Sequence, residues 1–204
     1  MKLPTENTPV EMVQEWLTAI NETEYDAEHR EGRLRGALRR LQAAMDEYHA
    51  VHEAVGKLDE PPWSGDMNAR KALKAIARAL CDVAYEAIGS ALLRGEDLSG
   101  YNLRCTESSG ETRATIEQML YDLFRDDEGP DSCYPIRKAA AFYGFGDKLE
   151  ACFAEVHRAN MAKLWCGVCG KSGCHIRRNV HGEVAPKFGW EPPDLGPILF
   201  GGEK

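Results

Sequence analysis

The sequence has no long apolar run and no surplus of positive charge, and both absences restrict what the protein can be. Every apolar stretch is soon interrupted by Lys, Arg, Asp or Glu, so no segment is expected to span a membrane. The first thirty residues do not combine a basic start with an apolar run, as a secretion signal would, and we expect a cytoplasmic protein. With 25 Lys and Arg against 33 Asp and Glu, the net charge of -8 disfavours nonspecific binding to nucleic acid.

β-Branched residues are also scarce. Val, Ile and Thr together number 23, whereas there are 24 Ala and 18 Leu, and this balance favours helices over strands. The composition therefore predicts an all-α protein, which we expect to form an antiparallel helical bundle with a small C-terminal zinc-binding module and an extended tail.

Local patterns predict helices over about 9–21, 23–55, 67–94, 111–126, 134–143 and 146–165. The first begins with a capping box, in which Thr8 precedes Pro9 and is followed three residues later by Glu11. The second has apolar positions at alternating steps of four and three from Leu34 to Val55, typical of a coiled-coil seam. Such a seam can pair within the chain or with a second copy, so a homodimer is possible.

Three segments are predicted from the positions of the glycines and prolines. Residues 1–96 form the long-helix bundle, residues 111–165 form shorter helices packed on it, and residues 166–204 form the zinc module and a Pro/Gly-rich tail. The Gly- and Ser-rich stretch 95–110 is the expected boundary. The tail from Gly189 is expected to be extended and packed on the body or on a partner.

A cluster of cysteines follows the last predicted helix. Cys166 and Cys169 have the Cys-x2-Cys spacing with which two thiolates converge on one metal ion, and the turn resembles the knuckle of zinc ribbons and related small zinc modules. Cys174 with His181 completes a tetrahedral set, and His175 with His181 is the competing choice. Either set fills the coordination shell, so we expect a structural zinc ion.

The C-terminal part differs in charge from the rest. Residues 1–130 carry 15 basic and 25 acidic side chains, whereas residues 131–204 carry 10 and 8. Basic residues with aromatic neighbours around the zinc module predict a possible contact with nucleic acid. The candidate contact residues are Lys171, Arg177, Arg178 and Lys187.

Four functions remain open at this stage. The first is a non-enzymatic binding or regulatory protein that acts through protein-protein contacts; the second is a nucleic-acid-associated factor that uses the C-terminal module. The third is an acidic inhibitor of a phage or mobile element, which blocks a nucleic-acid-binding machine and presents Glu24, Glu28 and Glu31 to its protein partner. The fourth is a metal-dependent hydrolase on the bundle, for which Glu28 with Glu31 and Asp82 with Glu86 are weak carboxylate pairs. We expect that the protein is not an enzyme.

Overall fold

A computed structural model describes residues 7–55, 67–105, 110–123, 133–164, 176, 178, 183–186 and 189–201. Over these residues the chain is helical, and its one β-bridge joins Arg178 to Val184. The predicted all-α class is confirmed, and no described helix is long and apolar enough to cross a membrane. The helices are α1 (Pro9–Ala19), α2 (Ala27–Val55), α3 (Met67–Arg94), α4 (Arg113–Asp122), α5 (Cys133–Phe142), α6 (Leu149–Leu164) and α7 (Gly196–Phe200).

The capping box at the start of α1 is confirmed. The Thr8 backbone N–H donates to Glu11 Oε2 at 2.6 Å, and the Glu11 N–H donates to Thr8 Oγ1 at 3.3 Å. Both hydrogen bonds satisfy amide groups that have no acceptor within the first helical turn.

The second helix begins later than predicted, at Ala27 rather than about residue 23. Asp26 accepts a hydrogen bond from the His29 backbone N–H at 3.1 Å and so caps α2 at this point. The preceding residues form a turn that includes Asn21 with a φ of 55°. Because Glu22 lies in this turn, its side chain is free to fold back onto α2. The helix continues without interruption through Gly32 and Gly36.

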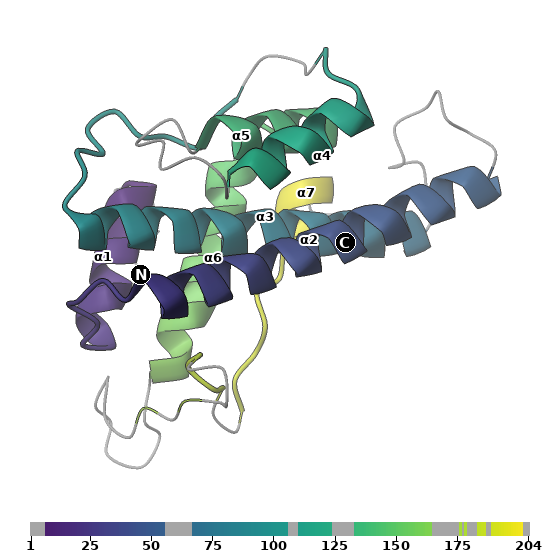
Figure 1. Ribbon diagram of the computed structural model, residues 1–204. Coiled ribbons are helices and arrows are strands. Elements are labelled where there is room, and N and C mark those ends of the chain that lie inside the picture. The colour runs from purple at the N-terminus through teal and green to yellow at the C-terminus, as the bar shows by residue number, and fades with distance from the viewer. Residues whose placement is uncertain are drawn as a thin grey trace.

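The third helix is the centre of the molecule. It packs against α1, α2, α5 and α6, and most of its residues between Ala69 and Ala91 are buried. Helices α2 and α3 lie side by side along most of their length (Figure 1). They run in opposite directions, because Arg33 pairs with Glu86 whereas Arg40, further along α2, pairs with the earlier Asp82.

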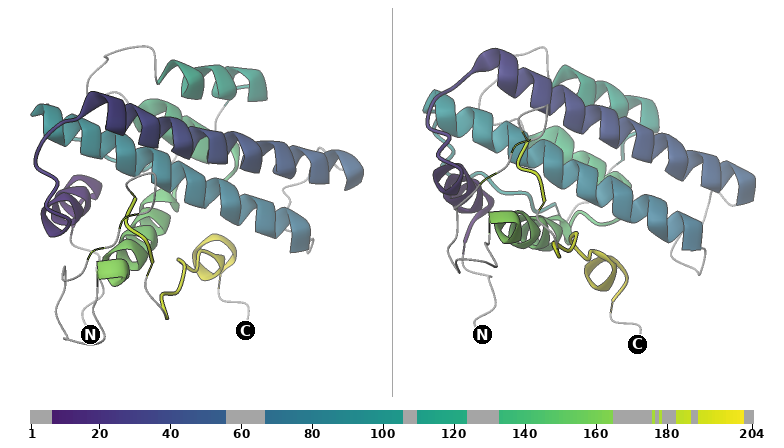
Figure 2. Two further views of the ribbon diagram at one scale, coloured as in Figure 1. Left: turned by 60° about the horizontal axis from the view of Figure 1, so that its bottom comes forward. Right: turned by 90° about the horizontal axis from the view of Figure 1, so that it is seen from below.

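The remaining helices cover two sides of the α2–α3 pair. Helices α4 and α5 lie on one side, and α1 and α6 lie on the other, where α6 crosses the pair steeply (Figure 1). Figure 2 shows α7 beside α6 on this second side. The antiparallel order therefore describes the α2–α3 pair, and an antiparallel bundle of the whole molecule stays a prediction.

The tail is not extended throughout. Gly196–Phe200 forms α7, because Pro197 in its first turn has a backbone angle suited to a helix start. Leu195 and Leu199 are buried, and Lys148 Nζ on the body donates to the Leu199 carbonyl at 2.7 Å. These contacts hold the described part of the tail against α6.

One buried cluster of apolar residues includes side chains from α1 to α7. Leu98, Tyr101 and Leu103 belong to it, although they lie in the connection after α3 that was predicted to separate two segments. The described part of this connection therefore packs into the same core as the helices on either side of it.

Candidate functional site

Two arginines and two glutamates form an ion-pair network between α2, α3 and the turn before α2. Arg33 Nη2 lies 2.8 Å from Glu86 Oε1, and its Nη1 lies 3.3 Å from Glu22 Oε2. Arg30 pairs with Glu22, and its Nη1 lies 3.3 Å from Glu86 Oε2. Arg30 is only 2% exposed, so its charge depends on these carboxylates. The network fixes the side chains at one wall of a cavity.

This cavity, which we call the polar cleft, has a volume of about 540 Å³. Its walls come from α1, α2, α3, α6 and the C-terminal segment, so only the tertiary structure assembles it. The lining side chains are Trp16, Arg33, Arg40, Arg78, Asp82, Tyr85, Glu86, Asn160, Lys163, Glu183, Val184, Ala185, Pro186 and Trp190. They comprise four cations, three carboxylates and three aromatic rings.

The carboxylates of α3 that line the polar cleft are already paired with arginines. Asp82 Oδ1 lies 3.1 Å from Arg78 Nε, and Asp82 Oδ2 lies 3.8 Å from Arg40 Nη2. Glu86 belongs to the network with Arg30 and Arg33. A divalent cation needs several carboxylate or carbonyl oxygens, and the α2 side chains facing this pair are guanidinium groups. This donor set repels a cation and suits an anion.

Among the described residues, Lys163 is the one cation of the polar cleft that forms no ion pair with a carboxylate. Its Nζ lies 5.2 Å from the centre of the Trp190 ring, a cation–π contact. Burial lowers the pKa of Lys163 because it disfavours the charged form, and the positive charge of Arg78 acts in the same direction, whereas Asp82 and Glu183 act against it. Trp190 is itself fixed, since its Nε1 donates to the Ala159 carbonyl at 2.6 Å. Neither Asp82 nor Glu183 forms an ion pair with Lys163, so an anion in the cleft would be its direct charged partner.

A chain of hydrogen bonds leads from the polar cleft to the molecular surface. The Tyr85 hydroxyl lies 2.6 Å from His157 Nδ1, and His157 Nε2 lies 3.2 Å from Glu15 Oε2. Asn160 also lines the cleft and acts on Tyr85 by lowering its pKa. Burial raises the pKa of Tyr85 and lowers the pKa of His157, so both side chains are held in their neutral forms.

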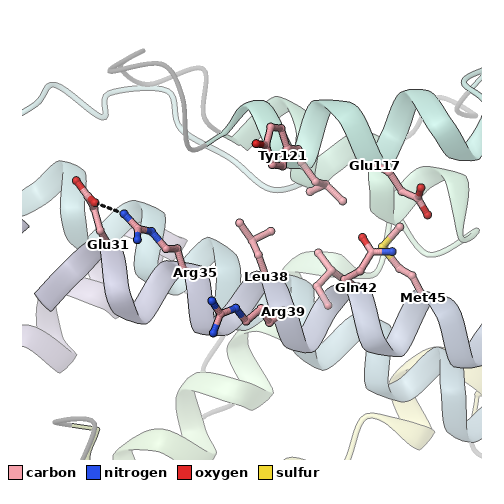
Figure 3. Close-up of a pocket in the computed structure, with 10 residues that line it drawn as sticks. Glu31, Arg35, Leu38, Arg39, Gln42, Met45, Glu117 and Tyr121 are labelled. Carbon is pink, nitrogen blue, oxygen red and sulfur yellow. Dashed lines mark hydrogen bonds and ion pairs between the residues drawn. The ribbon is translucent and has the colours of Figure 1, made fainter. Parts of the chain in front are cut away.

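A second cavity, an apolar groove of about 460 Å³, lies between α2 and α4 (Figure 3). Its apolar lining includes Leu38, Met45 and Leu120, and Tyr121 on α4 is 61% exposed. At its rim Glu31 pairs with Arg35 at 2.6 Å. This groove is separate from the polar cleft and shares no lining residue with it.

Most of the candidate residues from the zinc module lie outside the described residues. This holds for the predicted metal ligands and for three of the four predicted nucleic-acid contacts: Cys166, Cys169, Cys174, His175, His181, Lys171, Arg177 and Lys187. Arg178 is described: it is exposed, and its Nη2 donates to the Ile20 carbonyl at 3.4 Å. In the described parts of the chain, no group of three or more His, Cys, Asp or Glu side chains is placed to hold a metal ion.

The three glutamates predicted to face a partner are exposed. Glu28 and Glu31 are on α2, and Glu24 lies in the turn before it. Glu31 is paired with Arg35 across one helical turn. The structure therefore leaves these carboxylates on the surface and does not gather them into the polar cleft.

No protein-family model, curated protein or solved structure matches this chain. The functional argument therefore rests on the side chains of the polar cleft. Sequence reasoning placed Asp82 and Glu86 on one helix face but missed the facing residues, of which Asn160 and Lys163 are spaced by three on α6. The sequence signal for them was weak, because one amide and one lysine at helical spacing are common on solvated helix faces.

Proposed function

We propose that the protein is a non-enzymatic binding protein that recognises an anionic group in the polar cleft. The observation that carries this proposal is Lys163, a half-buried cation that faces the cavity and an aromatic ring and forms no ion pair in the described part of the chain. Sulfate, phosphate and carboxylate groups share the required chemistry, since each accepts charge-assisted hydrogen bonds from Lys and Arg.

Two further features support anion binding. Arg40 and Arg78 line the same cavity and share Asp82 as a partner; Arg40 lies 3.8 Å from Asp82 and 3.7 Å from Glu183, so both of its ion pairs are long. The aromatic rings of Trp16 and Trp190 provide apolar walls that exclude water and strengthen electrostatic contacts. A hydrolase that uses a divalent metal is less well supported, because the carboxylates of α3 are neutralised by arginines.

The proposal is tested by titrating the protein with sulfate and following tryptophan fluorescence, since Trp16 and Trp190 line the polar cleft. We expect saturable binding that Lys163→Met weakens by about tenfold, as for loss of one charge-assisted hydrogen bond. Lys74→Met is the matched control: it removes the same charge from an exposed position of α3 outside the cleft, and it should change the affinity less than twofold.

Two results would contradict the proposal. The first is a fluorescence signal that never saturates in the unmodified protein. The second is an equal loss of affinity in Lys163→Met and Lys74→Met, which would mean that sulfate affinity depends only on the net charge of the protein. Melting temperatures of both variants show whether each retains its fold.

The other functions inferred from the sequence stay proposals. Action through protein-protein contacts is favoured by the apolar groove between α2 and α4, with its exposed Tyr121. A structural zinc ion rests on the Cys-x2-Cys spacing of Cys166 and Cys169. Nucleic-acid contact through the C-terminal module rests on basic residues with aromatic neighbours, and inhibition through Glu24, Glu28 and Glu31 rests on charge alone.

A further inference from the structure

The hydrogen bonds behind the polar cleft have a defined direction when His157 is neutral. A carboxylate only accepts hydrogen bonds, so the proton of the imidazole lies on Nε2, which donates to Glu15 Oε2. His157 Nδ1 then has a free lone pair and accepts the Tyr85 hydroxyl proton at 2.6 Å. Asn160 lowers the pKa of Tyr85, as a group that stabilises negative charge on the Tyr85 oxygen does. The proton of Tyr85 thus points away from the cleft.

Protonation of His157 reverses this arrangement. Both ring nitrogens of an imidazolium are donors, so Nδ1 would donate to the Tyr85 oxygen instead of accepting from it. The hydroxyl proton of Tyr85 must then find another acceptor, and the cavity that Tyr85 lines is the adjacent open space. A buried hydroxyl left without an acceptor is unfavourable, which favours occupation of the cleft by an acceptor.

We propose that Tyr85 is a positioning residue for the anion in the polar cleft, and that protonation of His157 turns the Tyr85 hydroxyl proton toward that anion. This proposal rests on the proposed function. It makes anion affinity rise as the pH falls, and by reciprocity it makes the bound anion favour protonated His157.

The surroundings of His157 and Tyr85 identify the groups involved. From α1, Glu15 faces His157, and from α3, Tyr85 stacks on its ring with centroids 6.2 Å apart. Asp82 and Glu86 on α3 are the other carboxylates that act on Tyr85. Burial lowers the pKa of His157, and Glu15 partly offsets this. The relay, by which we mean protonation of His157 and the resulting turn of the Tyr85 hydroxyl, therefore operates below the ordinary histidine pKa of about 6.5.

The proposal is tested by measuring sulfate affinity at pH 5.5 and pH 7.5, because sulfate keeps its charge of −2 across this range. In the unmodified protein we expect about fivefold tighter binding at pH 5.5, as for one additional hydrogen bond to an anion. Tyr85→Phe keeps the ring but lacks the hydroxyl, so it should still bind sulfate at pH 7.5. The ratio of its sulfate affinities at pH 5.5 and pH 7.5, which we call the pH ratio, should fall below about twofold. His157→Gln, which does not titrate, should behave in the same way.

His49→Gln is the matched control, since His49 is a partly buried histidine whose Nε2 contacts Tyr143, away from the polar cleft. It should keep the pH ratio of the unmodified protein. If Tyr85→Phe retains the full ratio, the relay is wrong while sulfate binding still supports the proposed function. If the unmodified protein binds no sulfate at either pH, both proposals fail. NMR of His157 adds a direct readout: saturating sulfate should raise its pKa by less in Tyr85→Phe than in the unmodified protein, because only the direct attraction between sulfate and the imidazolium remains in the variant.

Discussion

At the scale of single residues, one wall of the polar cleft depends on charged side chains that are buried as ion pairs. Arg30 and Arg33 keep their charge because Glu22 and Glu86 lie between them. Burial lowers the pKa of Arg30, whereas the two glutamates outweigh burial at Arg33 and raise its pKa. The same arginines at the surface would contribute little to stability, because water and salt screen exposed ion pairs.

Removal of one glutamate from this network should therefore be costly. Glu86→Gln leaves two arginines with a single carboxylate, and we expect it to lower the free energy of unfolding by about 3 kcal/mol. Urea denaturation measures this value. Glu31→Gln is the control: it makes the same change in an exposed pair with Arg35 and should cost about 0.5 kcal/mol or less. Equal losses in the two variants would show that the network is no stronger than a surface pair.

At the scale of helices, small residues let α3 lie close to its neighbours. A Cβ atom at Gly89 would lie 2.8 Å from Arg30 Nη1 and 3.6 Å from Val13 Cγ1. Arg30 is held by Glu22 and Glu86 and has little freedom to move aside. Gly89 therefore permits the close approach of α1, α2 and α3.

Two glycine substitutions test this explanation by opposite effects. Gly89→Ala should lower the free energy of unfolding by about 1–3 kcal/mol, because overpacking outweighs the gain in helix propensity. Gly32→Ala lies where no atom is within 4 Å of the new Cβ, so it should raise the free energy of unfolding by about 0.5–1 kcal/mol. Thermal or urea unfolding distinguishes the signs. Stabilisation by both would mean that Arg30 moves without cost.

At the scale of the whole molecule, the C-terminal segment completes the fold and the polar cleft together. Trp190 is anchored to α6 through the Ala159 carbonyl, and the Asp194 backbone N–H donates to Glu155 Oε1 at 3.0 Å. The predicted zinc ligands lie between α6 and this segment in the sequence. A metal ion bound by these ligands would link α6 to this segment and stabilise its docked position.

The zinc prediction has a direct test. Metal analysis of the purified protein should return about one zinc ion per chain, as one tetrahedral set of ligands requires. Cys166→Ser should lose most of the metal and lower the melting temperature, because metal binding is coupled to folding. Cys105→Ser, outside the cluster, should keep the metal. Metal content near zero in the unmodified protein, or full content with unchanged melting in Cys166→Ser, would contradict the site.

The sequence by itself determined the helical class, the start of α1 and the approximate position of each long helix. These features depend on short-range patterns: the capping box at Thr8, the apolar repeat from Leu34, and the alanine-rich stripe of α3. It did not reveal the start of α2, because Asp26 and the earlier acidic residues are all plausible helix starts in sequence.

Only the tertiary structure decided where the charges pair and where the polar cleft lies. Glu22 directly precedes the helix predicted from about residue 23 and has no distinguishing pattern in sequence, yet it is half-buried against Arg30 and Arg33. Lys163 and Tyr85 are 78 residues apart and meet only because α6 crosses α3. Charge pairing and cavities depend on contacts between distant elements, whereas helix propensity and capping depend on neighbours within one or two turns.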